Sequence, residues 1–200
     1  MSPRHLALTA LSLVLALSAC GTAGRMVAPV AGMITGRSTP PAAVKAQSDA
    51  PAITVVLTAR GITFPMRLLE REGDVTTWVA GDGAQMETRN GIVISTRGFG
   101  QDLMSSIPPS VSDLMRVGDT HERRYFMLNG ADETQLRAYI CKMEKAEGGD
   151  GPAGALHVTE TCLDKNRRMT NEYWIGSGGR ILKSRQFISP KAGYVIFSAP

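Results

Sequence analysis

The stretch VTTWVAGDGAQMETRNGIVISTR, residues 75–97, decides the fold class. It holds three short runs, 75–80, 84–89 and 92–97, separated by Gly81-Asp82-Gly83 and by Asn90-Gly91. Runs rich in Val, Ile and Thr predict β-strands, and Asn-Gly suits the type I′ turn that matches the twist of two antiparallel strands. The stretch therefore predicts three antiparallel strands joined by tight turns.

The same pattern continues on both sides of this stretch. Further strands are predicted at residues 53–58, 62–70, 122–128, 155–163, 169–175, 180–188 and 194–198. The segment from Gly98 to Gly118 interrupts them with two prolines and two short helical signatures, one of them a capping box formed by Ser110 and Asp113. About ten strands with a short helical insertion predict an all-β fold, an antiparallel meander that forms a sandwich or a partly open barrel.

The segment 133–147 has two competing interpretations. Its apolar residues recur at the i, i+3, i+4 and i+7 spacing of an amphipathic helix. However, Cys141 and Cys162 lie almost symmetrically about a glycine-rich turn centred on Gly151, as two residues that face each other across a hairpin do. We therefore expect strands here and a disulfide between Cys141 and Cys162, which implies an oxidising compartment.

The N-terminus has the layout of a secretory signal peptide. Arg4 precedes an uncharged apolar run from Leu6 to Leu17, which is too short to span a bilayer, and Leu17-Ser18-Ala19-Cys20 follows. These last residues resemble the lipobox of bacterial lipoproteins, which implies a signal peptide over residues 1–19 and a lipid attached to Cys20. The alternative is an ordinary signal peptide followed by an incidental cysteine.

The remainder divides into a tether and a domain. Residues 20–51 are rich in Ala, Gly, Pro, Ser and Thr without a sustained period, which predicts a flexible tether. Residues 52–200 are enough for a single β domain with its own core. Gly21 after the lipidated cysteine resembles an outer-membrane address, so we expect a lipid-anchored protein on the periplasmic face of the outer membrane.

Charge and motifs argue against several functional classes. The net charge is +4, from 22 basic and 18 acidic residues that are scattered along the chain, which does not indicate a nucleic-acid partner. Nucleophile elbows, phosphate loops and dinucleotide fingerprints are missing from the sequence. His121 and His157 are interpreted as lone surface residues, and no spacing suggests a metal site. We expect a protein that is not an enzyme and needs no cofactor.

Two segments carry a family resemblance. The first comprises Trp78, Asn90-Gly91, Thr96-Arg97-Gly98 and Leu103, and the second comprises Asn171 to Trp174, Gly179 to Gln186 and Pro190. Over residues 52–200 the chain resembles the YjbF/GfcB family, the group 4 capsule polysaccharide lipoproteins, although it departs from enteric members in carrying Cys141 and Cys162. The resemblance implies a role in producing or exporting exopolysaccharide or capsule, beside a large outer-membrane β-barrel protein. It carries over no catalytic residues.

Six residues form the predicted binding surface for polysaccharide or a partner: Trp78, Arg97, Tyr173, Trp174, Arg180 and Lys183. Aromatic faces and cationic side chains suit an acidic polysaccharide. The alternative is that both tryptophans belong to the core. Strand alternation places Glu172 and Trp174 on one face of the sheet and Tyr173 on the other, so Trp78, Tyr173 and Trp174 are not all expected in the core. Two functions remain, a non-catalytic accessory factor of polysaccharide export and a lipid or glycolipid carrier, which would need a deep apolar cavity.

Overall fold

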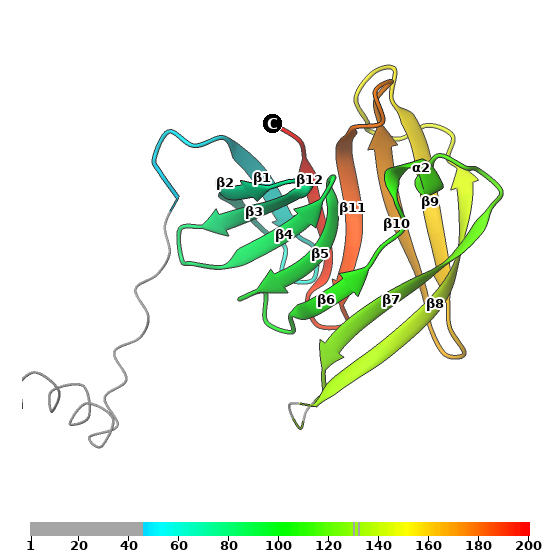
Figure 1. The fold of residues 1–200 in the computed structure, drawn as a ribbon, viewed down its shortest axis with the longest axis horizontal. Helices are drawn as coiled ribbons and strands as arrows, with labels where there is room; N and C mark the ends of the chain where they lie inside the picture. Colours follow the sequence, from blue (N-terminus) through cyan, green and yellow to red (C-terminus); the bar gives the residue numbers. More distant parts are fainter. Residues whose placement is uncertain (1–45, 130, 132) are drawn as a thin grey trace, which may run out of the picture. The chain divides into compact units, whose positions relative to one another are not determined.

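The computed structural model describes residues 46–200 except Gly130 and Asp132, so the predicted signal peptide, Cys20 and most of the tether lie outside the described residues. These residues form one sheet of 12 antiparallel strands in the order β5-β4-β3-β2-β1-β12-β11-β10-β9-β8-β7-β6 (Figure 1). The elements are β1 (Ala52–Leu57), β2 (Ile62–Glu72), β3 (Val75–Ala80), β4 (Gln85–Arg89), β5 (Ile92–Arg97), β6 (Leu103–Ile107), α2 (Val111–Leu114), β7 (Thr120–Leu128), β8 (Thr134–Lys145), β9 (Leu156–Leu163), β10 (Arg168–Ile175), β11 (Ile181–Ser189) and β12 (Gly193–Ser198). The prediction of an all-β antiparallel meander is confirmed.

The meander follows from local turn chemistry. Asn90 has a φ of 50° and Gly91 a φ of 86°, which is the left-handed pair that a type I′ turn requires between β4 and β5. Along β3 and β4 the side chains of Trp78 and Met86 lie opposite each other and are both buried. The turn geometry and the alternation of buried and exposed side chains therefore favour the same strand register, because a shift of one residue would turn Trp78 or Met86 toward the solvent.

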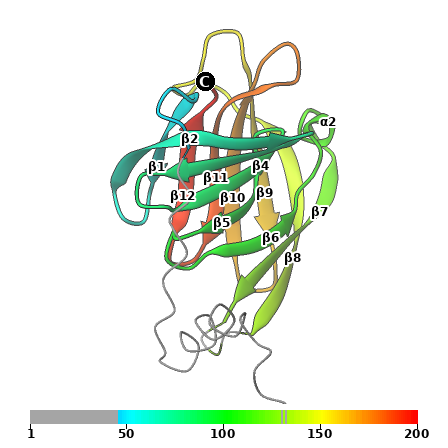
Figure 2. The same cartoon turned by 60° about the vertical axis from the view of Figure 1, so that its left-hand side comes forward.

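The sheet curls until its two edge strands approach each other. Figure 2 shows β2 to β5 running across β9 to β12, so the two halves of the sheet enclose the core. The backbone N–H of Val93 on β5 donates to Gln186 Oε1 of β11 at 2.9 Å, and Ser106 Oγ of β6 donates to the carbonyl of Val93 at 3.0 Å. Side chains thus form hydrogen bonds with backbone groups of the edge strand β5, and these groups are then not available to pair with a strand of another molecule. The result is the partly open barrel rather than two separate sheets.

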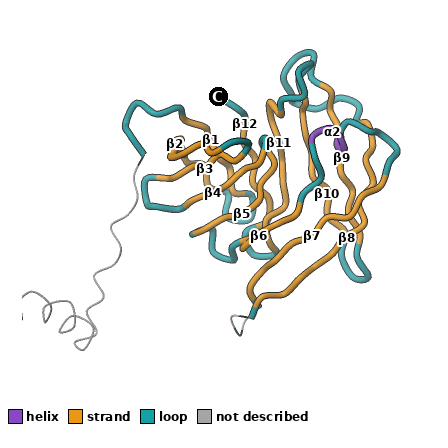
Figure 3. The backbone as a smooth tube through the Cα atoms, in the orientation of Figure 1, coloured by secondary structure: helices purple, strands orange, loops and turns teal. Residues whose placement is uncertain are grey.

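The segment Gly98–Gly118 departs from the prediction in one part. Its second helical signature is α2, where the Ser110 and Asp113 capping box is present as expected. The other predicted signature is wrong, because α2 is the one helix described in this segment, and residues 103–107 form strand β6 and pair with β7 (Figure 3). The described chain also has 12 strands where we expected about ten. Pairing at the edge of the sheet decides the structure of a segment whose local pattern is weak.

Cys141 and Cys162 face each other in the register of β8 and β9, and they form a disulfide with an S–S distance of 2.05 Å and a Cα–Cα distance of 3.9 Å. The strand interpretation and the disulfide are therefore confirmed, and the helical interpretation of residues 133–147 is wrong. Most of the core lies in one hydrophobic cluster that includes both cysteines, and a second cluster packs under Leu114 of α2. Among the described residues no helix is long and apolar enough to cross a membrane.

Candidate functional site

The turns at one end of the sheet surround the largest described cavity, with a volume of about 800 Å³, which we call the mouth cavity. It is lined by the β2–β3, β4–β5 and β10–β11 turns, by α2 and by the end of the chain at Pro200. In an antiparallel meander alternate turns lie at the same end of the sheet, so segments distant in sequence meet here. The mouth cavity therefore depends on the fold and not on one local motif.

The walls of the mouth cavity combine an aromatic ring with hydroxyl groups. Trp78 Nε1 donates to Thr88 Oγ1 at 3.4 Å, and Thr88 Oγ1 donates to the carbonyl of Thr76 at 3.4 Å. Trp78 is 5% exposed and Thr88 is 3% exposed, so both belong to the inner wall. Arg180 stands at the opening, where its Nη2 donates to the carbonyl of Pro200 at 2.5 Å.

A second group of side chains lies on the outer face of β9 to β11, and we call it the outer shelf: His157, Trp174 and Lys183. Trp174 pairs in register with His157 on one side and with Lys183 on the other. The imidazole stacks on the indole with ring centroids 4.2 Å apart and an interplanar angle of 12°, and Lys183 Nζ lies 4.9 Å from the indole centroid. The outer shelf is therefore an aromatic and cationic row across three strands.

The loop between β8 and β9 covers the outer shelf. His157 Nδ1 bonds to the carbonyl of Gly148 at 2.8 Å, and Lys183 Nζ donates to the carbonyl of Asp150. Gly151 packs so closely on Trp174 that a Cβ there would lie 1.9 Å from the indole Cδ1. The loop lines an open cavity of about 450 Å³ beside the two rings. Trp174 is consequently buried although its side chain points away from the barrel interior.

A charged network lies inside the barrel, between β7, β9 and β10. Arg123 Nη1 donates to Glu160 Oε2 at 2.7 Å and to Tyr173 Oη at 2.9 Å. The same carboxylate oxygen accepts from Asn171 Nδ2 at 2.7 Å and from the Tyr173 hydroxyl at 3.1 Å. Arg123 and Glu160 are both fully buried. These hydrogen bonds compensate for part of the lost hydration, while Nε and Nη2 of Arg123 are buried without a hydrogen-bond partner among the described residues.

Mutual attraction fixes the charge states of this network. Burial raises the pKa of the Glu160 carboxyl, but the Arg123 guanidinium and the hydrogen bonds from His121 and Asn171 outweigh burial and lower it from 4.5 to about 2. Burial also disfavours the charge of Arg123, but Glu160 outweighs this and raises the pKa of the guanidinium. Burial raises the pKa of the Tyr173 hydroxyl well above its usual value. At neutral pH the network therefore holds one cation, one anion and a neutral phenol.

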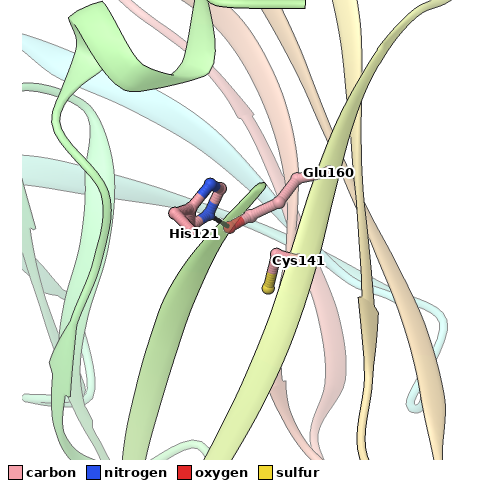
Figure 4. Close-up of side chains that lie close together, drawn as sticks. All are labelled: His121, Cys141 and Glu160. Atoms are coloured by element: carbon pink, nitrogen blue, oxygen red, sulfur yellow. Dashed lines mark hydrogen bonds and ion pairs between the residues drawn. The ribbon is translucent and has the colours of Figure 1, made fainter. Parts of the chain in front are cut away.

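His121, Cys141 and Glu160 come together at the edge of this network (Figure 4). Their potential ligand atoms lie within 4.8 Å of one another, and His121 Nε2 is 2.7 Å from Glu160 Oε1. However, the sulfur of Cys141 is bonded to Cys162, and a metal ligand would have to be a thiolate. The donor set thus does not fit a metal ion, and His121 serves as a hydrogen-bond partner of the buried carboxylate.

The structure separates the six residues of the predicted binding surface. Trp78 and Arg180 line the mouth cavity, and Trp174 and Lys183 belong to the outer shelf. Tyr173 is buried in the charged network, so it is not available as a surface group. Arg97 is exposed at the far end of β5, away from the residues that line the mouth cavity. The six residues do not form one surface.

Two interpretations of single residues need correction. His121 and His157 are not lone surface residues, because both rings are mostly buried and bonded to partners. The buried pair of Arg123 and Glu160 was not predicted. The signal for it was present in residues 120–128, where the alternation that places Tyr125 and Met127 inside also places Arg123 inside. Its partner lies 37 residues away, and only the strand register brings the two together.

Comparisons with known proteins agree with this geometry. A family model described as group 4 capsule polysaccharide lipoprotein gfcB, YjbF, matches residues 33–198. The crystal structure of the hypothetical lipoprotein YmcC from Escherichia coli K12 superposes with a TM-score of 0.62 at 15% sequence identity, covering 88% of this chain and 97% of the other. At that identity the likeness shows a shared fold. No curated protein matches the sequence.

Proposed function

Because the chain belongs to the YjbF family of group 4 capsule polysaccharide lipoproteins, we propose that it is a lipid-anchored, non-catalytic accessory factor in the production or export of capsule or exopolysaccharide. The family match over residues 33–198 is the observation that carries this proposal. The anchor is the lipid on Cys20, which holds the domain at the periplasmic face of the outer membrane. An outer-membrane β-barrel protein of the export system and the polysaccharide itself are the proposed partners.

The disposition of the ionisable groups supports a role without catalysis. The pair with the strongest interactions, Arg123 and Glu160, lies inside the barrel, where each group already has hydrogen-bond partners. A general acid or base must instead reach a substrate within hydrogen-bond distance. Neither the mouth cavity nor the outer shelf combines a nucleophile with an orienting base among the described side chains.

The filling of the barrel supports an accessory role over a lipid carrier. A carrier needs a deep apolar cavity, whereas here core side chains and the charged network occupy the space between the two halves of the sheet. An apolar cavity of about 330 Å³ exists at the opposite end, next to Leu57, Phe64 and Phe99, but its volume is at the lower limit for a small ligand. Of the two larger cavities, the one beside the β8–β9 loop has mostly polar walls, and the mouth cavity combines apolar side chains such as Ile53 and Phe197 with polar groups.

We place the working surface at the end of the sheet that holds the mouth cavity and the outer shelf. Arg180 and Lys183 lie close to the β10–β11 turn there. The guanidinium of Arg180 lines the mouth cavity, and the ammonium of Lys183 lies over the Trp174 ring. A surface of this kind suits an acidic polymer or an acidic patch of a protein. Arg97 at the other end of β5 supplies a matched basic residue outside this surface.

The test is a charge reversal in cells that make the polysaccharide. A strain whose own gene is deleted would be complemented with the wild type, with Arg180→Glu/Lys183→Glu or with Arg97→Glu. We expect normal surface polysaccharide from the wild type and the Arg97 variant, and reduced surface polysaccharide from the double variant. Urea unfolding of the purified domains controls for misfolding, because Lys183 also anchors the β8–β9 loop. Normal export by the folded double variant would exclude this surface.

A further inference from the structure

We propose that the mouth cavity is a binding site for an anionic saccharide, with Arg71 and Arg180 contacting the acidic group and Trp78 contacting the sugar ring. This inference rests on the proposed function and adds to it a direct contact with the polymer. Arg71 is contributed by the end of β2, Arg180 by the β10–β11 turn and Trp78 by β3. No single element contains the site, and the curl of the sheet assembles it.

The charge at the cavity opening selects an anion. Arg71 and Arg180 both line the cavity, whereas the one acidic residue in its lining, Asp74, is paired with Arg89 at 3.4 Å between Nε and Oδ2. Within residues 46–200, Gly130 and Asp132 aside, Arg71 has no ion-pair partner and no side-chain hydrogen bond. Arg180 uses Nη2 to hold the carbonyl of Pro200 and has further donors for a ligand. Two guanidinium groups with unused donors suit a carboxylate or phosphate substituent.

The walls suit the rest of a sugar. Trp78 is 5% exposed, so a small part of its ring reaches the inner wall, where the apolar C–H groups of a saccharide can contact it. Thr76, Ser112 and Asn90 add hydroxyl and amide groups to the lining, and these can both donate and accept hydrogen bonds with sugar hydroxyls. A purely anionic ligand would need only the arginines, so the combination indicates a saccharide that carries the charge.

The volume of the mouth cavity limits what it can hold. About 800 Å³ lies within the range of about 300–1,000 Å³ that small-ligand sites occupy. A few sugar residues fit this volume, but a long segment of polymer does not. We therefore assign the mouth cavity to a chain end or a short branch that carries an acidic group.

Tryptophan fluorescence gives a direct binding assay, because the chain has two tryptophans and only Trp78 lines the mouth cavity. The domain from residue 46 to the end, made with Trp174→Phe, would be titrated with trigalacturonate, with its fully methyl-esterified form and with citrate at low salt. We expect trigalacturonate to change Trp78 emission saturably and to bind at least about tenfold more tightly than the uncharged ester, since a charge-assisted hydrogen bond is lost in the ester. Higher salt should weaken this binding.

Matched variants locate the site. Arg71→Gln and Arg180→Gln should each weaken trigalacturonate binding about tenfold, and Arg97→Gln should leave it unchanged, because Arg97 does not line the mouth cavity. Equal binding of trigalacturonate and its ester, equal binding of citrate, or unaltered affinity in both arginine variants would overturn the inference. So would no binding at all by a domain whose unfolding transition is intact. Polysaccharide export is measured in a separate experiment on cells. If gene deletion reduces surface polysaccharide but the domain does not bind trigalacturonate, the proposed function stands and only the binding site is excluded.

Discussion

Replacing Glu160 by glutamine removes the negative charge of the buried network and should destabilise the domain by about 3–5 kcal/mol, because the Arg123 guanidinium then stays buried without a counter-charge. The shifted pKa gives an independent magnitude. Lowering the Glu160 pKa from 4.5 to about 2 corresponds to about 3 kcal/mol, at about 1.4 kcal/mol per pH unit. The two routes agree, so breaking the network by removing one partner should cost a large part of the stability of a domain this size.

The pH dependence has a defined sign. A carboxyl whose pKa is lowered in the folded state stabilises the fold fully above the ordinary value of 4.5, and this contribution is lost as the pH falls toward 2. The free energy of unfolding of the wild type should therefore decline by about 3 kcal/mol over this interval from Glu160 alone. In Glu160→Gln this part of the decline should be absent.

The assay is urea unfolding followed by circular dichroism, at pH 7 and at steps down to pH 2. Glu144→Gln is the matched control, because Glu144 pairs with Lys142 at the surface of β8, where an ion pair contributes only about 0.2–1 kcal/mol. The double variant Arg123→Met/Glu160→Gln should be more stable than Glu160→Gln, since the unpaired charge is gone. A loss in Glu160→Gln no larger than in the control, or a double variant less stable than the single one, would refute the reasoning.

Three further predictions concern covalent and close contacts. Replacing Cys141 and Cys162 by serine should cost about 3 kcal/mol, judged by urea unfolding, because the bond closes a loop with a sequence separation of 21; an unchanged midpoint would contradict this. Cys20→Ser should abolish labelling by a clickable fatty acid, and labelling at the wild-type level would exclude the lipid anchor. Gly151→Ala cannot fit against Trp174, so tryptophan emission should shift to the red as the β8–β9 loop moves; an unshifted spectrum would show that the loop does not cover the ring.

Much of the fold could be predicted from short-range patterns. The Asn90-Gly91 turn and the flanking runs specify β4 and β5 locally, and the nearly symmetric placement of Cys141 and Cys162 about Gly151 specifies a hairpin against a competing helical period. Strand β6 could not be predicted in this way, because its residues are held by pairing with β7 and by the contact of Ser106 with β5 at the seam of the barrel. Contacts of that kind depend on the closed sheet and leave little trace in the local sequence.

The arrangement of the candidate site could not be predicted from the sequence. Aromatic and basic residues were predicted to form one binding surface, but Trp78 and Trp174 lie in different places, one in the barrel interior and one under a loop on its outer face. The alternation of side chains along a β-strand predicts that Tyr173 and Trp174 point to opposite faces of the sheet. It could not show that the glycine-rich loop covers Trp174, or that Arg71 and Arg180 line the same cavity, because both depend on how the sheet curls.

Surface polysaccharide in a strain that lacks this gene tests the central claim most directly. Deletion should reduce the capsule or exopolysaccharide at the cell surface, and the wild-type gene should restore it, whereas Cys20→Ser should restore it poorly because the domain loses its anchor. Quantifying the polymer in washed cells and in the medium separates export from retention at the surface. Unchanged amounts of polymer in both fractions of the deletion strain would contradict the assignment to polysaccharide production or export.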